Sequence, residues 1–289
     1  MTLTALYGQL LVGLMNGSFY ALLSLGLAII FGLLGIVNVA QGALYMAGAF
    51  FSWMFLQWLG IGYWPALVLS PLAVAVLGVI LEKTIIFRVY GPDHMAGLLL
   101  TFGVMLVIQG LFIYLFGTAG RPYPVPAELR GGYNLEFMFL PKYRAWVVVA
   151  SLLVCFSTWF AIEKTSLGRS LRAANENPRL TRAFGINVPA LVTFSFGLGV
   201  ALAGFAGVLA APIYTVSPLM GADLVIIVFA VVVVGGLGSI LGSIVTGMAL
   251  GFIEGLTRVF YAQGSNMVIF VVMIIVLLIK PAGLFGQEK

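Results

Sequence analysis

The sequence predicts an all-α polytopic membrane protein, a helical bundle of about 8–9 transmembrane spans with short or broken helices near its end. Two observations lead to this fold class. Hydrophobic residues make up 62% of the chain and charged residues only 8%, against roughly 25% charged residues in a soluble domain. Apolar runs close to the ~20 residues that a membrane-spanning helix needs also recur along the whole chain. We therefore treat residues 1–289 as one transmembrane domain.

Nine apolar runs follow one another, separated by loops that carry most of the charges. The final runs are short or closely spaced, so the sequence leaves open whether they form two full spans, three spans or broken helices. The runs cover residues 9–31, 43–59, 65–87, 96–116, 145–162, 190–211, 223–234, 240–259 and 267–279.

Basic residues predict the orientation of these spans. They gather at Lys83 and Arg88, between Lys164 and Arg182, and at Lys280, and basic loops remain on the cytoplasmic side. The N-terminus is then outside and the C-terminus cytoplasmic. Residues 117–144, rich in proline and glycine, fall on the outer side as an ordered, extended loop. The net charge of +5 follows from this topology, and no separate basic domain exists that would bind nucleic acid.

Small residues recur every four positions in two of the runs. This spacing allows close approach of helix backbones, which drives packing in lipid, and so predicts a compact bundle. The stripes are Gly199, Ala203, Gly207 and Ala211, and Gly247, Gly251 and Gly255.

The longest charged stretch, residues 163–189, predicts two short helices in series. Ser166 is expected to cap a helix that begins at Leu167. Asn177 then caps a second helix with Pro178 at its first position, and Gly185 ends that helix in a left-handed conformation.

The second helix is too short to be stable alone, so its apolar side chains must pack on the bundle or on a partner protein. Those side chains are Leu180, Ala183 and Phe184. One interpretation is that residues 163–189 only hold the topology through their positive charge. The other is that they form a coupling element that transmits motion between a cytosolic motor and the membrane bundle.

Four segments carry a recognisable pattern. They read NGSFYALLSLGLAIIFGLLGIVNVAQG at 16–42, SLGRSLRAANENPRLTRAFGINVPALVTFSFGLGVALAGFAGVLAAP at 166–212, GGLGSILGSIVTGMALGFIE at 235–254 and KPAGLFG at 280–286. In this order they resemble the branched-chain amino acid permeases of ABC importers, the LivH/LivM family. The first segment is similar to the LivH-type subunit more than to the LivM-type subunit.

The resemblance implies a permease subunit in a bacterial inner membrane, surrounded by lipid. Its partners would be a second permease subunit (LivM-like or a second copy), two cytosolic ATP-binding subunits and an outer, periplasmic substrate-binding protein. Residues 163–189 would then form the ATPase-coupling loop. The coupling residues on this interpretation are Gly168, Arg169, Arg172, Glu176, Arg179, Arg182 and Gly185.

The solute would be a branched-chain amino acid or a related small polar molecule. The chain departs from the family at Asn38-Val39-Ala40-Gln41-Gly42-Ala43, where Asn-x-Ala-His-Gly-Glu is usual. Losing the imidazole and the carboxylate leaves urea, short amides or aromatic acids as alternative solutes.

Polar residues inside the runs have two interpretations each. Asn16, Ser18, Asn38 and Gln41 either hold helices together or line the translocation path. Glu254 and Arg258 are four residues apart on one helical face and can form an ion pair. Asp223 is expected at a water-exposed helix start, and a helix break or tight packing is expected at Gly235, Gly236, Gly238 and Gly242.

No catalytic, cofactor or metal site is predicted. The chain lacks G-x-x-x-x-G-K-[ST], so ATP hydrolysis must reside in another polypeptide. The rival from another class is an ion-driven secondary carrier, which would need buried carboxylates or histidines, and the chain has few of either.

Overall fold

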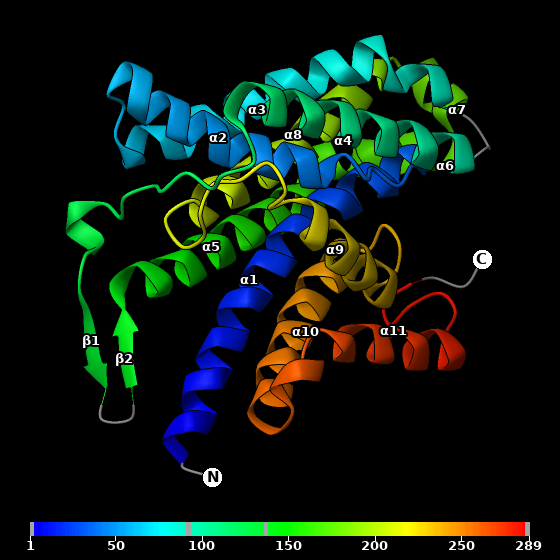
Figure 1. The fold of residues 1–289 in the computed structure, drawn as a ribbon. Coiled ribbons are helices and arrows are strands. Elements are labelled where there is room, and N and C mark those ends of the chain that lie inside the picture. The colour runs from blue at the N-terminus through cyan, green and yellow to red at the C-terminus, as the bar shows by residue number, and fades with distance from the viewer. Residues whose placement is uncertain (1–2, 91–93, 136–137, 287–289) are drawn as a thin grey trace. The chain divides into compact units, whose positions relative to one another are not determined.

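The computed structural model describes residues 3–90, 94–135 and 138–286, and helices dominate it (Figure 1). Eleven α-helices and one β-hairpin form within these residues. The helices are α1 (Leu3–Leu34), α2 (Gln41–Leu59), α3 (Tyr63–Thr84), α4 (His94–Phe116), α5 (Lys142–Lys164), α6 (Ser166–Glu176), α7 (Pro178–Ala183), α8 (Val188–Ala210), α9 (Ala222–Gly235), α10 (Ile240–Phe260) and α11 (Met267–Ile279). Three 3₁₀ turns accompany them, η1 (Ile86–Val89), η2 (Ala127–Leu129) and η3 (Ala262–Gly264).

The predicted fold class is confirmed, because each apolar run lies in one helix with small shifts at its ends. Six of the described helices are long and apolar enough to cross a membrane: α1, α3, α4, α5, α8 and α10. The 14-residue α9 and the 13-residue α11 extend only about 20 Å each, less than the ~30 Å hydrocarbon core. The short-helix alternative therefore applies to α9 and α11, whereas α10 between them is long enough to span.

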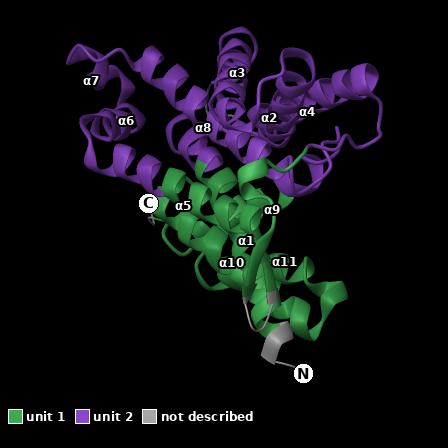
Figure 2. Cartoon of the chain, turned by 90° about the vertical axis from the view of Figure 1, so that its left-hand side faces the viewer, with its two compact units in different colours: residues 1–25, 124–155, 226–289 green, residues 26–123, 156–225 purple. Residues whose placement is uncertain are grey.

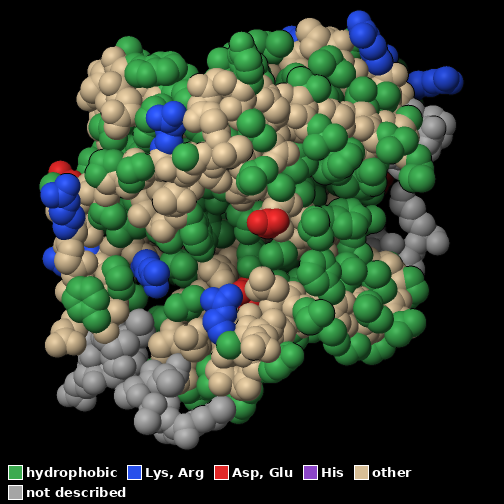
Figure 3. Space-filling model, viewed as in Figure 1, with side chains coloured by type: hydrophobic (Ala, Val, Ile, Leu, Met, Phe, Trp, Pro, Cys, Tyr) green, Lys and Arg blue, Asp and Glu red, His purple; other side chains and the backbone are tan. Residues whose placement is uncertain are grey.

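Much of the surface suits a lipid environment. Large apolar side chains such as Val76, Val107 and Leu153 are exposed on α3, α4 and α5. Hydrophobic side chains also cover most of the face seen in Figure 3, where lysines and arginines are few. Soluble monomers rarely expose apolar area on this scale.

The chain divides into two compact units (Figure 2). One, unit 1, comprises residues 1–25, 124–155 and 226–289. The other, unit 2, comprises residues 26–123 and 156–225. Helices α1, α5 and α9 contribute residues to both.

Glycines bring the helices of unit 2 into contact at the backbone level. A Cβ atom on Gly204 of α8 would meet Val74 of α3, and a Cβ atom on Gly48 of α2 would meet the Gly204 backbone. Gly207 likewise lies against the backbone of Tyr45, a side chain that is fully buried. The close packing predicted from the first small-residue stripe is confirmed.

The second stripe performs the same role in unit 1. Gly247, Gly251 and Gly255 of α10 lie against the backbone of α1, where Gly13 and Gly17 face them. Backbones this close leave no room for larger side chains. In lipid the hydrophobic effect does not drive helices together, so van der Waals contact between these backbones stabilises the pair.

Residues 117–144 contain secondary structure that the sequence did not predict. Strands β1 (Gly132–Leu135) and β2 (Met138–Pro141) form an antiparallel hairpin within unit 1, with Tyr133 opposite Leu140. Helix α5 then begins at Lys142, three residues before the predicted run. The prolines before the hairpin keep the loop extended, as expected, but they gave no signal for strand pairing.

Candidate functional site

Helix α6 turns one small face toward the protein and its charged face to solvent. Gly168, Leu171 and Ala174 are buried, as helical spacing predicts. A Cβ atom on Gly168 would collide with the carbonyl oxygen of Ile162, so only glycine fits where α6 crosses the end of α5. Gly168 therefore has a packing role that sets the direction of the loop.

The predicted start of α6 is wrong by one residue. Ser166 is the first helical residue, and Thr165 occupies the N-cap position without a side-chain capping bond. Thr165 instead donates its hydroxyl hydrogen to the carbonyl oxygen of Ala161 in the preceding turn of α5. That bond uses the hydroxyl that would otherwise be free to cap.

Helix α7 has the predicted caps. The Asn177 side chain accepts a hydrogen bond from the Leu180 N–H at 3.0 Å, and Pro178 takes the first helical position. Gly185 has φ +82°, and its N–H donates to the Arg182 carbonyl at 2.9 Å. Because both ends are fixed, a helix of only six residues is held in one conformation.

The apolar side chains of α7 do not pack on the protein. Thr181 is the buried residue of this helix, whereas Leu180 is 57% exposed and Phe184 at its end is 78% exposed. The sequence allowed these side chains to pack either on the bundle or on a partner protein. The bundle does not cover Leu180 or Phe184. We name Leu180 and Phe184 the α7 apolar patch.

The loop that carries this patch also carries exposed charged side chains. Arg172 forms an exposed ion pair with Glu163 at 2.7 Å, a contact of small energetic weight. The other charged residues that the sequence singled out are also exposed, namely Arg169, Glu176, Arg179 and Arg182. The loop thus combines exposed positive charge with exposed apolar area, which is typical of a protein-docking surface.

A second polar site lies in unit 2, where α1 ends and α2 begins. The connection is buried, and Thr101 of α4 holds it by accepting from the Val39 N–H (3.1 Å) and donating to the Val37 carbonyl (3.0 Å). Gln41 donates to the Gly199 carbonyl of α8 at 3.0 Å. Asn38 is fully buried, yet neither of its amide atoms has a partner among the described residues.

Such an orphaned amide is costly, about 1–3 kcal/mol, and needs an explanation. Gln41 joins α2 to α8 through its amide nitrogen, which donates to Gly199, while its amide oxygen has no partner among the described residues. The structure gives the Asn38 amide no hydrogen-bonding role, because Thr101 satisfies the backbone of the connection and neither amide atom has a partner among the described residues.

Asn16 and Ser18 lie in unit 1 and have different surroundings. The Asn16 amide donates to Glu254 Oε1 at 3.2 Å, and Ser18 donates to the Met15 carbonyl of its own helix at 2.7 Å. Tyr20 donates to Glu254 Oε2 at 2.8 Å, and Arg258 forms the predicted ion pair with the same carboxylate. The Glu254 cluster therefore joins α1 to α10 in the protein interior.

The glycine cluster is a tight turn closed by the C-terminal segment. Helix α9 ends at Gly235, and the Ser239 side chain caps α10 by accepting from the Gly242 N–H. The N–H groups of Leu284 and Phe285 donate to the carbonyls of Val234 and Gly235 at 2.8 and 3.1 Å. Both expectations for these glycines are met, because the helix breaks between α9 and α10 and the glycines pack closely at the turn. Asp223 lies exposed in the first turn of α9, also as expected.

Comparison with known protein families matches residues 9–277 to the family described as "Branched-chain amino acid transport system / permease component". The match covers most of the chain. The chain belongs to this permease family.

Curated relatives place the permease nearer one of the two subunit types. It is 28% identical to the branched-chain amino acid transport system permease protein BraD of Pseudomonas aeruginosa and to LivH of Escherichia coli, over 97% of this chain and 96% of each relative. It is also 28% identical to LivM of Salmonella typhimurium, but over 93% of this chain and only 68% of that protein. The LivH-type resemblance is confirmed by this fuller coverage.

Sequence reasoning missed a buried carboxylate in the permease. Glu82, near the end of α3, is 3% exposed and accepts hydrogen bonds from Tyr90 (2.6 Å) and from Thr193 of α8 (3.0 Å). Burial and the hydrogen bond to Glu82 raise the pKa of the Tyr90 phenol, which favours the protonated form that donates this bond. The sequence indicated only the neighbouring Lys83, as a marker of topology. The partner Thr193 lies 111 residues away in the chain, so its contact with Glu82 could not be predicted from local sequence.

A junction of two loops in unit 2 was also missed. Arg121 pairs with Val216 through two backbone hydrogen bonds of 2.9 Å. Its guanidinium carbon lies 4.8 Å from the Trp53 ring centroid, and Nη2 donates to the Phe116 carbonyl at 3.0 Å. The loop after α4 and the loop after α8 therefore form one surface at this point.

Proposed function

We propose that this permease is the transmembrane subunit of an ABC importer and forms the translocation path for branched-chain amino acids or a related small polar solute. Separate cytosolic ATPase subunits drive the transport. The observation that carries the proposal is the α7 apolar patch, a rigid, doubly capped helix with Leu180 and Phe184 exposed among arginines. A docked ATPase subunit would cover this patch and move α8, which follows it directly.

The proposal includes a bacterial inner-membrane location with the N-terminus outside and the coupling loop cytoplasmic. On the outer side, residues 117–144 and 212–222 receive the substrate-binding protein. The Arg121–Val216 pairing supports this, because it joins the start of the first loop, directly after α4, to the second loop. A second permease subunit, LivM-like or identical, completes the path.

Substituting Gly185 tests the coupling role through the backbone. A valine there is strained at φ +82°, although no neighbouring atom lies within 4 Å of its Cβ position. We expect Gly185→Val to displace the end of α7, so that the assembled transporter hydrolyses ATP without solute uptake. Both activities are measured on the same proteoliposomes. Gly185→Asn is the matched control, because asparagine tolerates the left-handed conformation, and it should keep both. Normal coupling of ATP hydrolysis to uptake in Gly185→Val would contradict the coupling role and leave residues 163–189 with a role in topology only.

Asn38 is the path residue that the structure supports best, because packing gives its amide no partner. Replacing it with leucine of similar size removes an orphaned polar group, so Asn38→Leu should leave thermal stability unchanged or raise it by about 1 kcal/mol. Uptake should nevertheless fall, since the solute loses a hydrogen-bonding group. Thr101→Val is the control. It removes a satisfied hydroxyl of the same junction and should lower stability. Unchanged uptake by a well-assembled Asn38→Leu protein would exclude Asn38 from the path.

A further inference from the structure

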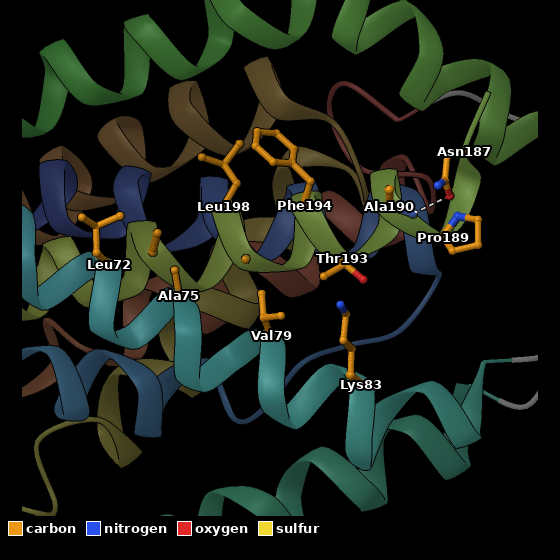
Figure 4. Close-up of a pocket in the computed structure, with 12 residues that line it drawn as sticks. Leu72, Ala75, Val79, Lys83, Asn187, Pro189, Ala190, Thr193, Phe194 and Leu198 are labelled. Atoms are coloured by element: carbon orange, nitrogen blue, oxygen red, sulfur yellow. Dashed lines mark hydrogen bonds between the residues drawn. The ribbon is translucent and has the colours of Figure 1, made fainter. Parts of the chain in front are cut away.

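A groove of about 680 Å³ runs between α3 and α8 in unit 2 (Figure 4). Its walls are mostly apolar, lined by Leu72, Ala75 and Val79 of α3 and by Phe194 and Leu198 of α8. Polar groups occur only toward one end, where Lys83 points from α3 toward Thr193 (Figure 4). A zwitterionic amino acid would leave its charges unpaired along such walls, so the groove does not suit the transported solute.

The length of the groove matches one leaflet of a bilayer. Lys83 follows Leu72 by eleven residues, which is about 16 Å along a helix. Half of a typical ~30 Å hydrocarbon core is about 15 Å. An acyl chain that starts at Lys83 would therefore reach the Leu72 end near the middle of the membrane.

Lys83 supplies a positive charge at the polar end. Among the described residues it forms no ion pair. The neighbouring carboxylate of Glu82 is buried and already accepts from Tyr90 and Thr193, so it does not neutralise a group in the groove. The N-terminus of α8 does not offer a second site for an anion in place of Lys83. The Asn187 side chain already caps it by accepting from the Ala190 N–H.

We propose that this groove binds an anionic phospholipid, with one acyl chain between α3 and α8 and the phosphate at Lys83 Nζ. The proposal goes beyond the transport function and does not depend on the identity of the solute. Charge complementarity at one end and leaflet length along the walls favour a lipid over a second protein chain.

Native mass spectrometry of the full-length permease in detergent tests this binding, with phosphatidylglycerol and phosphatidylethanolamine added in equal amounts. The wild-type protein should prefer phosphatidylglycerol. Lys83→Gln should lower its apparent affinity for phosphatidylglycerol about fivefold, while Lys83→Arg should keep it. Ala75→Phe fills the groove and should reduce binding of both lipids.

Val76→Phe is the control for added bulk, because Val76 is exposed on α3 and does not line the groove. It should bind phosphatidylglycerol as the wild type does. Equal affinity for the two lipids in the wild type, or unchanged binding in Lys83→Gln or Ala75→Phe, would overturn the proposal. So would efficient cross-linking of an Ala75→Cys protein to a second permease subunit in membranes, because a protein would then cover the groove.

Discussion

Replacing Leu180 and Phe184 together with serine is expected to abolish ATP-driven uptake while the permease remains folded in the membrane. Both side chains are mostly exposed, so the permease itself loses little packing. Burying a leucine or phenylalanine against a partner contributes about 1.5–3 kcal/mol each. The double variant should therefore bind the ATPase subunits at least about 100-fold more weakly.

Co-purification of the ATPase subunits with the permease measures this loss directly. Phe139→Ser is the matched control, because Phe139 is another exposed aromatic residue and lies in the hairpin of residues 132–141. It should retain the ATPase subunits in wild-type amount. Full retention by the Leu180→Ser, Phe184→Ser double variant would contradict the role assigned to the α7 apolar patch.

Glu254→Gln is expected to destabilise the permease strongly. The Glu254 side chain is 2% exposed and holds Asn16, Tyr20 and Arg258 at once. The amide cannot compensate Arg258, whose side chain is 31% exposed, and its N–H₂ group meets other donors. We expect a loss of about 3 kcal/mol, the lower end of the range for breaking a buried ion pair.

The midpoint of thermal unfolding in detergent is the measurement. Glu163→Gln is the control, since it makes the same chemical change in the exposed pair with Arg172, where less than about 1 kcal/mol is at stake. Similar midpoints for the two variants would contradict the stabilising role given to the Glu254 cluster. A Glu254→Gln protein that is stable but shows no uptake would instead indicate that the Glu254 carboxylate takes part in transport.

Local signals predicted the helices of this permease well. The runs at 240–259 and 267–279 agree with α10 and α11 to within a residue, because glycine and polar breakers flank them. The caps at Asn177 and Gly185 were predictable for the same reason, since cap chemistry is encoded within a few residues.

Contacts between distant segments could not be predicted. Nothing near Asn16 indicates that its amide meets Glu254, 238 residues later, so the sequence left both packing and path lining open. The same holds for Glu82 with Thr193 and for the docking of Leu284 on Val234. The hairpin at residues 132–141 was missed because Gly132 and Pro141 at its ends, and the prolines before it, indicate a loop as readily as a paired strand.

Uptake into proteoliposomes is the most direct test of the central claim, that this chain provides a path whose energy comes from separate ATPases. The permease is reconstituted alone and with its second permease subunit, ATPase subunits and binding protein. The account predicts uptake of radiolabelled leucine only by the complete assembly with ATP, and none by the chain alone under a proton or sodium gradient. Gradient-driven uptake by the chain alone would contradict it.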